Sequence, residues 1–593
     1  MKKALVVIAV LSVTMTCTSP SGESRGGHVK IWEIDDPQSL NPFTTSSATA
    51  HYICDNIFQR LLNQSYSSDE LLPVLAIERP HIVTSSDSMR LTFEIRPEAR
   101  WDNREPITAK DVEFSFKAVM CPGVNSVHYH PYLSFISGFR FYDDNPRKFD
   151  ILCDRIYMRA EYSAGYEVFI MPSYIYDPEN VLARFSFEQL RNDTSLARRP
   201  DIQSFARAFN SEKHGREKGF VVGSGPYALE TWQTGQRVEI IRKEEWWGNK
   251  VEAPGNMFFE AYPDRITYEV ISDMTAAITA LKGERIDVMY SIAADPYVND
   301  LKKNERVLAR FNLHEAPFLV FSAFGMNTRN PKLSNNLTRQ ALNHLMDYDR
   351  VINDIMMGMA TRVVGPVHPS SEGAYHSGLP LYDYKPSKAT ALLRKAGWKD
   401  SNGDGILDSI IDGKRIDLTI EFLLNQGNIL REHIALIFQN GCEQAGVKIK
   451  LTALDANVVL QRMAAHEFEM YYQVWVFEQA PTDYNQIFST AAWHGGSNYT
   501  YFGNAETDAL IAAMNKTVDE DARTPMLKQL QEILHHEVPF IFLWTQQQRI
   551  AIHKRFTNAN VSVTKPGFWA AGFKTIPGME ESADPAADSL GGI

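Results

Sequence analysis

The chain has 593 residues, of which 44% are hydrophobic and 22% charged, and this globular composition excludes collagen-like, disordered and polytopic membrane proteins. Its 60 basic and 72 acidic side chains give a formal charge of −12 without a basic cluster, which argues against nucleic acid as a partner. At roughly 150 residues per domain, the length allows about four domains.

Residues 1–16 have the pattern of a secretory signal peptide. Lys2 and Lys3 precede a short apolar run over 4–13, which cannot span a bilayer. Cys17 follows where a lipoprotein signal is cut and the new N-terminal cysteine is acylated, although Thr14 and Thr16 depart from the usual lipobox. Residues 17–27 have the composition of a flexible tether. We therefore expect an exported protein that a lipid anchors to a membrane.

Strands and helices then alternate along the chain, as in an α/β protein. Alternating apolar residues predict strands, and capping signals and apolar stripes predict helices. The predicted strands cover 29–34, 91–95, 238–242, 266–271, 286–288 and 447–451. The predicted helices cover 108–120, 273–281, 341–355 and 430–445. We expect Gly283 and Gly446 to end two of these helices, and residues 577–593 to form a disordered acidic tail.

Motifs for catalysis or for metal binding are missing or incomplete. The chain has no phosphate-binding GxxxxGK[ST], no HExxH and no GxSxG sequence. His51, His128 and His130 favour surface chemistry over a metal site, as do the adjacent His535 and His536. Residues 400–411 follow a calcium loop in part, but Ile411 replaces its bidentate glutamate, which favours a simple acidic turn. We predict no catalytic residue, metal or cofactor.

The cysteines after Cys17 leave two interpretations open. Cys121 and Cys153 can pair in an oxidising compartment, or they can be single buried thiols like Cys54 and Cys442.

Five ordered blocks resemble the large solute-binding proteins of bacterial ABC importers, extracellular solute-binding protein family 5, which includes dipeptide-, oligopeptide- and nickel-binding proteins. The blocks lie within 39–62, 91–116, 223–247, 266–287 and 327–347, with Arg60 where glycine is usual. The resemblance covers nearly all of 28–560 and implies an α/β, three-lobed, periplasmic-binding-protein type II-like fold of cluster C. Its implied domain I takes 28–69, 220–310 and 545–576, domain II takes 70–219 and domain III takes 311–544. Crossings near 314–317 and 544–545 would form a hinge between discontinuous lobes that closes over the solute.

The resemblance also implies the residues of a peptide site. In relatives, the ligand lies extended and pairs through its backbone. The matching positions here are Ser46, Ser47, Ala48, the segment near Gly225, and Val474, Trp475 and Val476. Trp475 is equally consistent with a cleft wall and with ordinary core.

Relatives place an aspartate three residues after this tryptophan, where it binds the α-ammonium of the ligand. Here the position is Glu478, which keeps the charge but shifts where an amine can sit. The alternatives are that Glu478 is only a solvated or structurally paired carboxylate, and that Asp483 takes its role.

The resemblance thus implies a monomeric, lipid-anchored receptor in the periplasm or on the cell surface, which captures a short peptide and delivers it to a membrane permease. The same fold hosts other solutes, so a metal chelate, haem or an oligosaccharide is an alternative ligand. Tyr472, Trp475, Tyr499 and Tyr501 can stack on sugars as well as line a peptide cleft. A secreted hydrolase is a further alternative.

Overall fold

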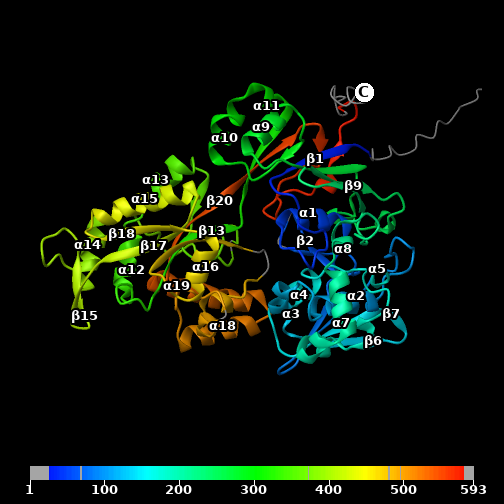
Figure 1. The fold of residues 1–593 in the computed structure, drawn as a ribbon, viewed down its shortest axis with the longest axis horizontal. Helices are drawn as coiled ribbons and strands as arrows, with labels where there is room; N and C mark the ends of the chain where they lie inside the picture. Colours follow the sequence, from blue (N-terminus) through cyan, green and yellow to red (C-terminus); the bar gives the residue numbers. More distant parts are fainter. Residues whose placement is uncertain are drawn as a thin grey trace, which may run out of the picture.

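The computed structural model describes residues 26–579, apart from 67, 69, 372, 478–480 and 495. The predicted signal peptide, Cys17 and most of the predicted tether and tail lie outside these residues. Two α/β lobes stand side by side, joined by a long strand that runs diagonally between them (Figure 1). Within the described part of the chain, no helix combines the length and the apolar character that crossing a bilayer requires.

One large mixed sheet runs through both lobes. Its strands follow the order β18, β17, β19, β13, β20, β11, β1, β10, β9 and β8, and β12 and β14 pair with β20 at its side. Their bounds are β18 (Lys448–Leu454), β17 (Thr419–Asn425), β19 (Met470–Val476), β13 (Val320–Met326), β20 (Phe540–His553), β11 (Val288–Met289), β1 (His28–Glu33), β10 (Arg265–Val270), β9 (Arg237–Arg242), β8 (Tyr227–Gln233), β12 (Phe311–Pro317) and β14 (Ala360–Arg362).

Strand β20 links the lobes because it pairs with different partners along its length. Its first half lies antiparallel to β13, with Phe540 opposite Gly325, and its second half lies antiparallel to β12, with His553 opposite Phe311. The chain passes from β12 to β13 through 318–319, directly beside β20. Both predicted crossings therefore lie in adjacent, hydrogen-bonded strands.

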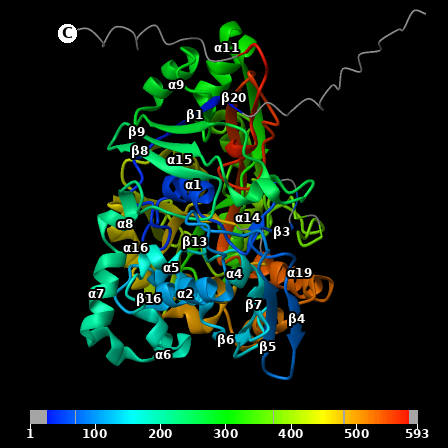
Figure 2. The same cartoon turned by 90° about the vertical axis from the view of Figure 1, so that its right-hand side faces the viewer.

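A second sheet lies in the insertion between β1 and β8. It has the order β4 (His81–Thr84), β5 (Met89–Glu94), β7 (Asn145–Cys153) and β6 (Ile136–Tyr142). Figure 2 shows β4 to β7 at the opposite end of the lobe from β8 and β9. Helix α2 (Ala109–Met120) packs on β7, and its predicted capping box is present, with Thr108 and Asp111 satisfying each other's backbone N–H groups.

The other helices of at least eight residues cover the large sheet or complete the insertion. They are α1 (Ala48–Ile57), α7 (Pro200–Phe209), α9 (Met274–Lys282), α12 (Asn336–Asn343), α14 (Pro386–Lys395), α15 (Ile429–Glu443), α16 (Ala456–Ala464), α18 (Ala505–Lys516) and α19 (Glu520–Glu537). In the lobe that contains β13, apolar side chains pack on both faces of the sheet. Phe324 and Met326 enter one core and Phe321 and Ala323 enter the other, as the alternation of a doubly covered strand requires.

Of the two helix ends predicted at glycines, one differs from the prediction. Gly283 is not left-handed, because α9 continues to Lys282 and Glu284 takes the positive φ of 59°. The N–H groups of Glu284 and Arg285 then bond to Leu281 and Ala280, which completes a Schellman end. Gly446, in contrast, has the expected positive φ of 76°.

The predicted single helix over 341–355 is also wrong. Helix α12 ends at Asn343, and the Asp347 side chain caps a new short helix by accepting a bond from the N–H of Arg350. A polar cap in the middle of an apolar stripe thus interrupts the helix.

The four described cysteines, Cys54, Cys121, Cys153 and Cys442, are all buried and unbridged. The structure therefore supports the interpretation as single buried thiols, and burial raises the pKa of Cys121 and of Cys153 to about 12.

Candidate functional site

Three cavities adjoin the boundary between the lobes. The acidic cavity has a volume of about 710 Å³ and is lined by Trp32, Glu33, Ile34, Asp35, Asp36, Gln38, Ser46, Ser47, Ala48, Thr49, Tyr52, Met274, Tyr290, Ser291, Phe318, Gln548 and Lys565. The tyrosine cavity, of about 330 Å³, shares Tyr52 and Lys565 with it and includes four more tyrosines, Tyr129, Tyr132, Tyr162 and Tyr166. The distal cavity, of about 510 Å³, lies between the residues around Tyr157 and those around Pro366 and Pro481.

The predicted segment Ser46, Ser47 and Ala48 lies in the wall of the acidic cavity, at the start of α1. The Ser47 hydroxyl caps the helix by accepting a bond from the N–H of Ala50 at 3.3 Å. The N–H of Ser47 donates to Thr45 Oγ1 at 3.2 Å. The helix start is thereby held rigidly beside the cavity.

The predicted strand Val474, Trp475 and Val476 is the end of β19. Pairing with β17 on one side stops at Tyr471, whereas pairing with β13 on the other side continues to Val476. The N–H of Phe477 donates to Leu319 on the β13 side. Because backbone direction alternates along a strand, the N–H and C=O groups of Val474 and Val476 point to the opposite edge. Among the described strands, none covers that edge.

The side chains at this end of β19 differ in exposure. Val476 is 58% exposed and lines the tyrosine cavity. Trp475 is half-buried and packs against the core that contains Phe321, and its buried indole N–H has no partner among the described residues. Trp475 is therefore at least partly a core residue.

Gly225 lies behind helix α1 and lines none of the three cavities. Its N–H already donates to the carbonyl of Ile57 at 2.8 Å, and a β-carbon at this position would meet Ile57 O at 2.7 Å. The glycine thus allows close packing against the end of the helix.

Asp483 is occupied by contacts within the protein. Its Oδ1 accepts bonds from the N–H of Asn485 and from Asn515 Nδ2, and its Oδ2 accepts one from the Tyr157 hydroxyl. This carboxylate therefore joins the two lobes and has little capacity left for a ligand. Glu478, the residue expected to meet the ligand amine, lies outside the described residues.

Two departures from sequence-based expectation lie in these cavities. Arg60, found where relatives usually have glycine, lines the tyrosine cavity, where it pairs with Asp55 at 2.5 Å and lies 3.5 Å from the centre of the Phe169 ring. Glu33, which was not predicted as a site residue, is only 1% exposed and lines the acidic cavity. The signal was present in β1, because alternation places Glu33 on the same buried face as Val29 and Ile31.

The sequence-based metal candidates do not assemble. Within the described residues, no group of three histidine, cysteine or acidic side chains is arranged to hold a metal ion. Over 400–411, Asp400 accepts bonds from the N–H groups of Gly403 and Gly405, and Asp408 accepts them from Ser401. The acidic side chains are thus used to fold the turn on itself.

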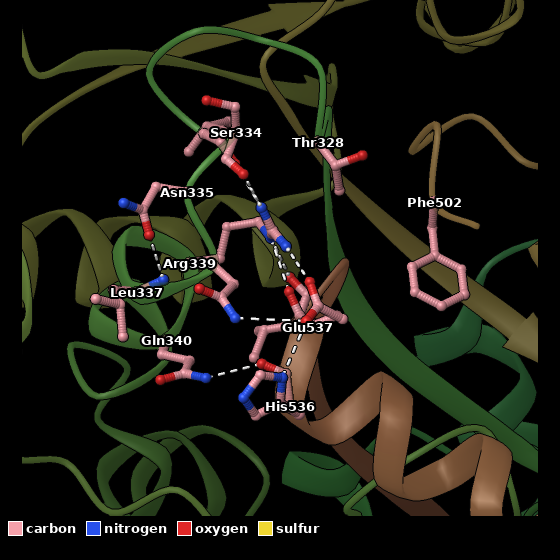
Figure 3. Close-up of polar contacts among 12 residues, drawn as sticks. Thr328, Ser334, Asn335, Leu337, Arg339, Gln340, Phe502, His536 and Glu537 are labelled. Atoms are coloured by element: carbon pink, nitrogen blue, oxygen red, sulfur yellow. Dashed lines mark hydrogen bonds and ion pairs between the residues drawn. The ribbon is translucent and has the colours of Figure 1, made fainter. Parts of the chain in front are cut away.

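Arg339, which lies in the sequence block 327–347 named above, has a structural role. Arg339 is 3% exposed, and its guanidinium donates to the carbonyl of Glu537 and pairs with the Glu537 carboxylate (Figure 3). It also donates to the carbonyl of Leu333. These bonds attach α12 to the C-terminal end of α19, where carbonyl groups need donors. Burial lowers the pKa of Arg339 to about 10, well above neutral pH.

Known proteins of the same fold share this arrangement of lobes. A solved structure of the oligopeptide-binding protein AppA from Bacillus subtilis, in complex with a nonapeptide, superposes with a TM-score of 0.68 at 20% identity, covering 93% of this chain and 100% of that one. NikA from Brucella suis, in complex with Fe(III)-EDTA, reaches a TM-score of 0.73 at 19% identity, with 93% and 100% covered.

Curated relatives are similar in sequence at 23–27% identity. AppA of Bacillus subtilis is 27% identical over 56% of this chain and 58% of its own length, and the glutathione-binding protein GsiB of Salmonella typhimurium is 26% identical over 60% and 64%. This chain therefore aligns with less than two thirds of either relative. The dipeptide-binding protein of Escherichia coli is 23% identical over 86% of this chain and 87% of its own length.

A family model, described as bacterial extracellular solute-binding proteins, family 5 middle, matches residues 70–495. This match spans more than half of the chain, from the insertion to the strands of the second lobe. The chain belongs to the bacterial extracellular solute-binding proteins of family 5.

Proposed function

We propose that this protein captures a short peptide between its two lobes and delivers it to the membrane permease of an ABC importer. The observation that carries the proposal is the uncovered edge of β19, which presents the main chain of Val474 and Val476, and Val476 lines the tyrosine cavity. An extended peptide can add to such an edge as a further strand, so main-chain bonds supply affinity without selecting a sequence.

The cavities give such a peptide room and a second wall. The acidic and tyrosine cavities adjoin at Tyr52 and Lys565, so a ligand that pairs with β19 can reach the start of α1 at Ser46 and Ala48. Closure of the lobes about the paired strands β12 and β20 would then enclose the ligand. The division into domains I, II and III with the bounds given above, and the monomeric state, belong to the same proposal.

Thermal unfolding in the presence of a library of dipeptides to hexapeptides would test peptide capture. A ligand that binds only the folded protein raises the unfolding temperature by mass action. Mass spectrometry of small molecules released from the purified protein by denaturation should identify a peptide. A released metal chelate, haem or oligosaccharide, with no shift from any peptide, would establish one of the alternative solutes instead.

Glu478 is proposed as the anchor of the ligand's α-ammonium. Its replacement by lysine should abolish binding of a peptide with a free N-terminus, because a like charge replaces an attractive one. Glu478→Gln should weaken the same peptide less. An N-acetylated copy of the peptide provides the control, since it has no ammonium and should bind the wild type and Glu478→Gln equally. If the peptide with a free N-terminus binds equally to the wild type, Glu478→Lys and Glu478→Gln, another residue must bind its ammonium group.

We also propose that the protein has no catalytic activity. A lipid on Cys17 would hold it in the periplasm or on the cell surface. Incubation with labelled peptides should leave them intact, and cleavage that depends on one cleft residue would favour the hydrolase alternative. Cys17→Ser should prevent acylation, which mass spectrometry of the mature protein and its release from membranes would both report.

A further inference from the structure

The acidic cavity contains a buried carboxylate with an unused oxygen. Glu33 ends β1, and its Oε2 accepts bonds from Thr49 Oγ1 at 2.8 Å and from the Tyr290 hydroxyl at 2.6 Å. Its Oε1 is buried and has no hydrogen-bond partner among the residues that the structure describes. A buried carboxylate that lacks partners is costly, which is why native proteins rarely keep one without a role.

A second acceptor in the same cavity is also unused. Gln548, on β20, is 3% exposed, and its Nε2 donates to the carbonyl of Pro566 at 2.6 Å. Its Oε1, the only acceptor of this side chain, is buried and has no partner within the described part of the chain. Glu33 and Gln548 come from strands on different sides of β11 and both line the acidic cavity.

Aromatic rings and further acids complete the walls. Tyr290 packs against Trp32 and Tyr52, with ring centres 6.1 and 6.0 Å away, and both of these line the cavity. Asp35 and Asp36 add carboxylates at its rim. Aromatic faces beside carboxylates form an environment that attracts organic cations.

Among the described residues that line the cavity, Lys565 is the one cation. Its ammonium lies 4.7 Å from the centre of the Phe318 ring, at the boundary with the tyrosine cavity, and burial lowers the pKa of this lysine. Against this single base stand Glu33, Asp35 and Asp36, so the formal charge of the lining is negative.

We propose that the acidic cavity is a subsite for a cationic side chain of the ligand, so that the protein prefers peptides with a lysine or an arginine at one position. This inference rests on the proposed peptide function and names the class of peptide. An ammonium or guanidinium group supplies both the donors that the two free oxygens lack and the charge that Glu33 needs when ionised. A neutral polar group would supply only the donors.

The perturbed titration of Glu33 agrees with this assignment. Burial raises its pKa to about 7, although the bonds from Tyr290 and Thr49 act in the opposite direction, and the charge of Asp35 raises it further. A ligand cation in the cavity favours the ionised form and would return the pKa towards its ordinary value.

The test is calorimetric titration with tetrapeptides of alanine in which each position in turn carries lysine or norleucine. The two residues have unbranched side chains, and only lysine carries a charge. At one position, the lysine peptide should bind the wild type about ten-fold more tightly, as expected for a buried charge-assisted bond. This comparison requires no variant, so a folding defect cannot decide it.

The variant Glu33→Gln keeps the shape of the side chain and should remove this preference while the norleucine peptide binds as before. Gln548→Met removes the second oxygen and should reduce the preference by a smaller factor. Glu252→Gln is the matched control, because this exposed glutamate lines none of the three cavities and its loss should change nothing.

Agmatine, a small cation without a peptide backbone, separates this inference from the proposed function. Peptides that bind with no lysine preference at any position, or a preference that survives in a folded Glu33→Gln protein, would overturn the subsite and leave the peptide function standing. Binding of agmatine that requires Glu33, without binding of any peptide, would retain the cation subsite and overturn the peptide function. If neither probe binds, both are overturned.

Discussion

The Tyr157 hydroxyl donates to Asp483 Oδ2 at 3.2 Å and so connects the insertion after β7 with the segment after β19. Nearby, the N–H of Met158 donates to the carbonyl of Asn515 at 2.8 Å. The described residues thus join the lobes both through the strands β12 and β20 and through this distal contact. If the lobes open about β12 and β20, this distal contact would break.

Tyr157→Phe should shift the protein towards an open form. The variant removes one hydrogen bond worth about 1 kcal/mol, which changes the ratio of closed to open molecules about five-fold. Small-angle X-ray scattering without ligand should show a larger radius of gyration. Tyr142→Phe is the control, because its hydroxyl bonds to Asp150 within the insertion itself. Identical scattering of both variants would show that Tyr157 does not hold the lobes together.

Val476→Pro should weaken peptide binding about ten-fold or more, because proline removes the N–H that the uncovered edge of β19 offers to a ligand. The pairing of β19 with β13 should survive, since this N–H points away from β13. Val476→Ala provides the control, as it shortens the side chain and keeps the N–H. Titration calorimetry measures both, and equal affinities would exclude this edge from peptide pairing.

Glu33 should make the folded protein less stable as the pH rises. The pKa of Glu33 is raised from 4.5 to about 7 by burial, so the folded state holds a proton that the unfolded state releases between these values. Its contribution to the free energy of unfolding is complete below about pH 4.5 and falls by up to about 3 kcal/mol as the pH passes 7.

Denaturant unfolding between pH 4.5 and 8 measures this effect. Glu33→Gln should flatten the decline by that amount, whereas Glu252→Gln, an exposed change outside the three cavities, should leave its slope unchanged. A parallel decline in Glu33→Gln and the wild type would show that Glu33 is ionised throughout this range.

Arg339→Met should lower the free energy of unfolding by about 3 kcal/mol, because it leaves the carbonyls of Leu333 and Glu537 without their donor. Arg415→Met removes an exposed arginine that pairs with Asp417 at 3.4 Å, and should cost less than about 0.5 kcal/mol. Denaturant unfolding compares the two. Peptide affinity should be unchanged in both, since neither arginine lines the three cavities.

Local features were predictable where a short stretch of chain carries the whole signal. The alternation in β1 and β5 and the capping box of α2 depend on neighbouring residues alone, and the structure confirms each. The left-handed residue at the end of α9 and the break after Asn343 were missed although both depend on bonds between near neighbours in sequence. A glycine was expected in the left-handed position that Glu284 takes, and the apolar stripe drew attention away from the Asp347 cap.

The candidate site was only partly predictable. The positions Ser46, Ser47, Ala48 and Val476 followed from the resemblance and all line cavities. Asp483 could not be assessed from the chain alone, because the residues that occupy it, Tyr157 and Asn515, lie far away in sequence. The packing role of Gly225 could not be predicted for the same reason, because the carbonyl of Ile57 that it bonds to belongs to a helix far away in sequence.

The sequence by itself determined the family, the α/β class and the positions of the six strands predicted from alternation, because ordered motifs and apolar alternation are properties of the chain. Only the tertiary structure decided which polar groups remain available to a ligand. Glu33 and Asp483 are both carboxylates near the cavities, yet one has a free buried oxygen and the other is bonded on both oxygens. The difference arises because hydrogen-bond partners from distant segments are brought together only by folding.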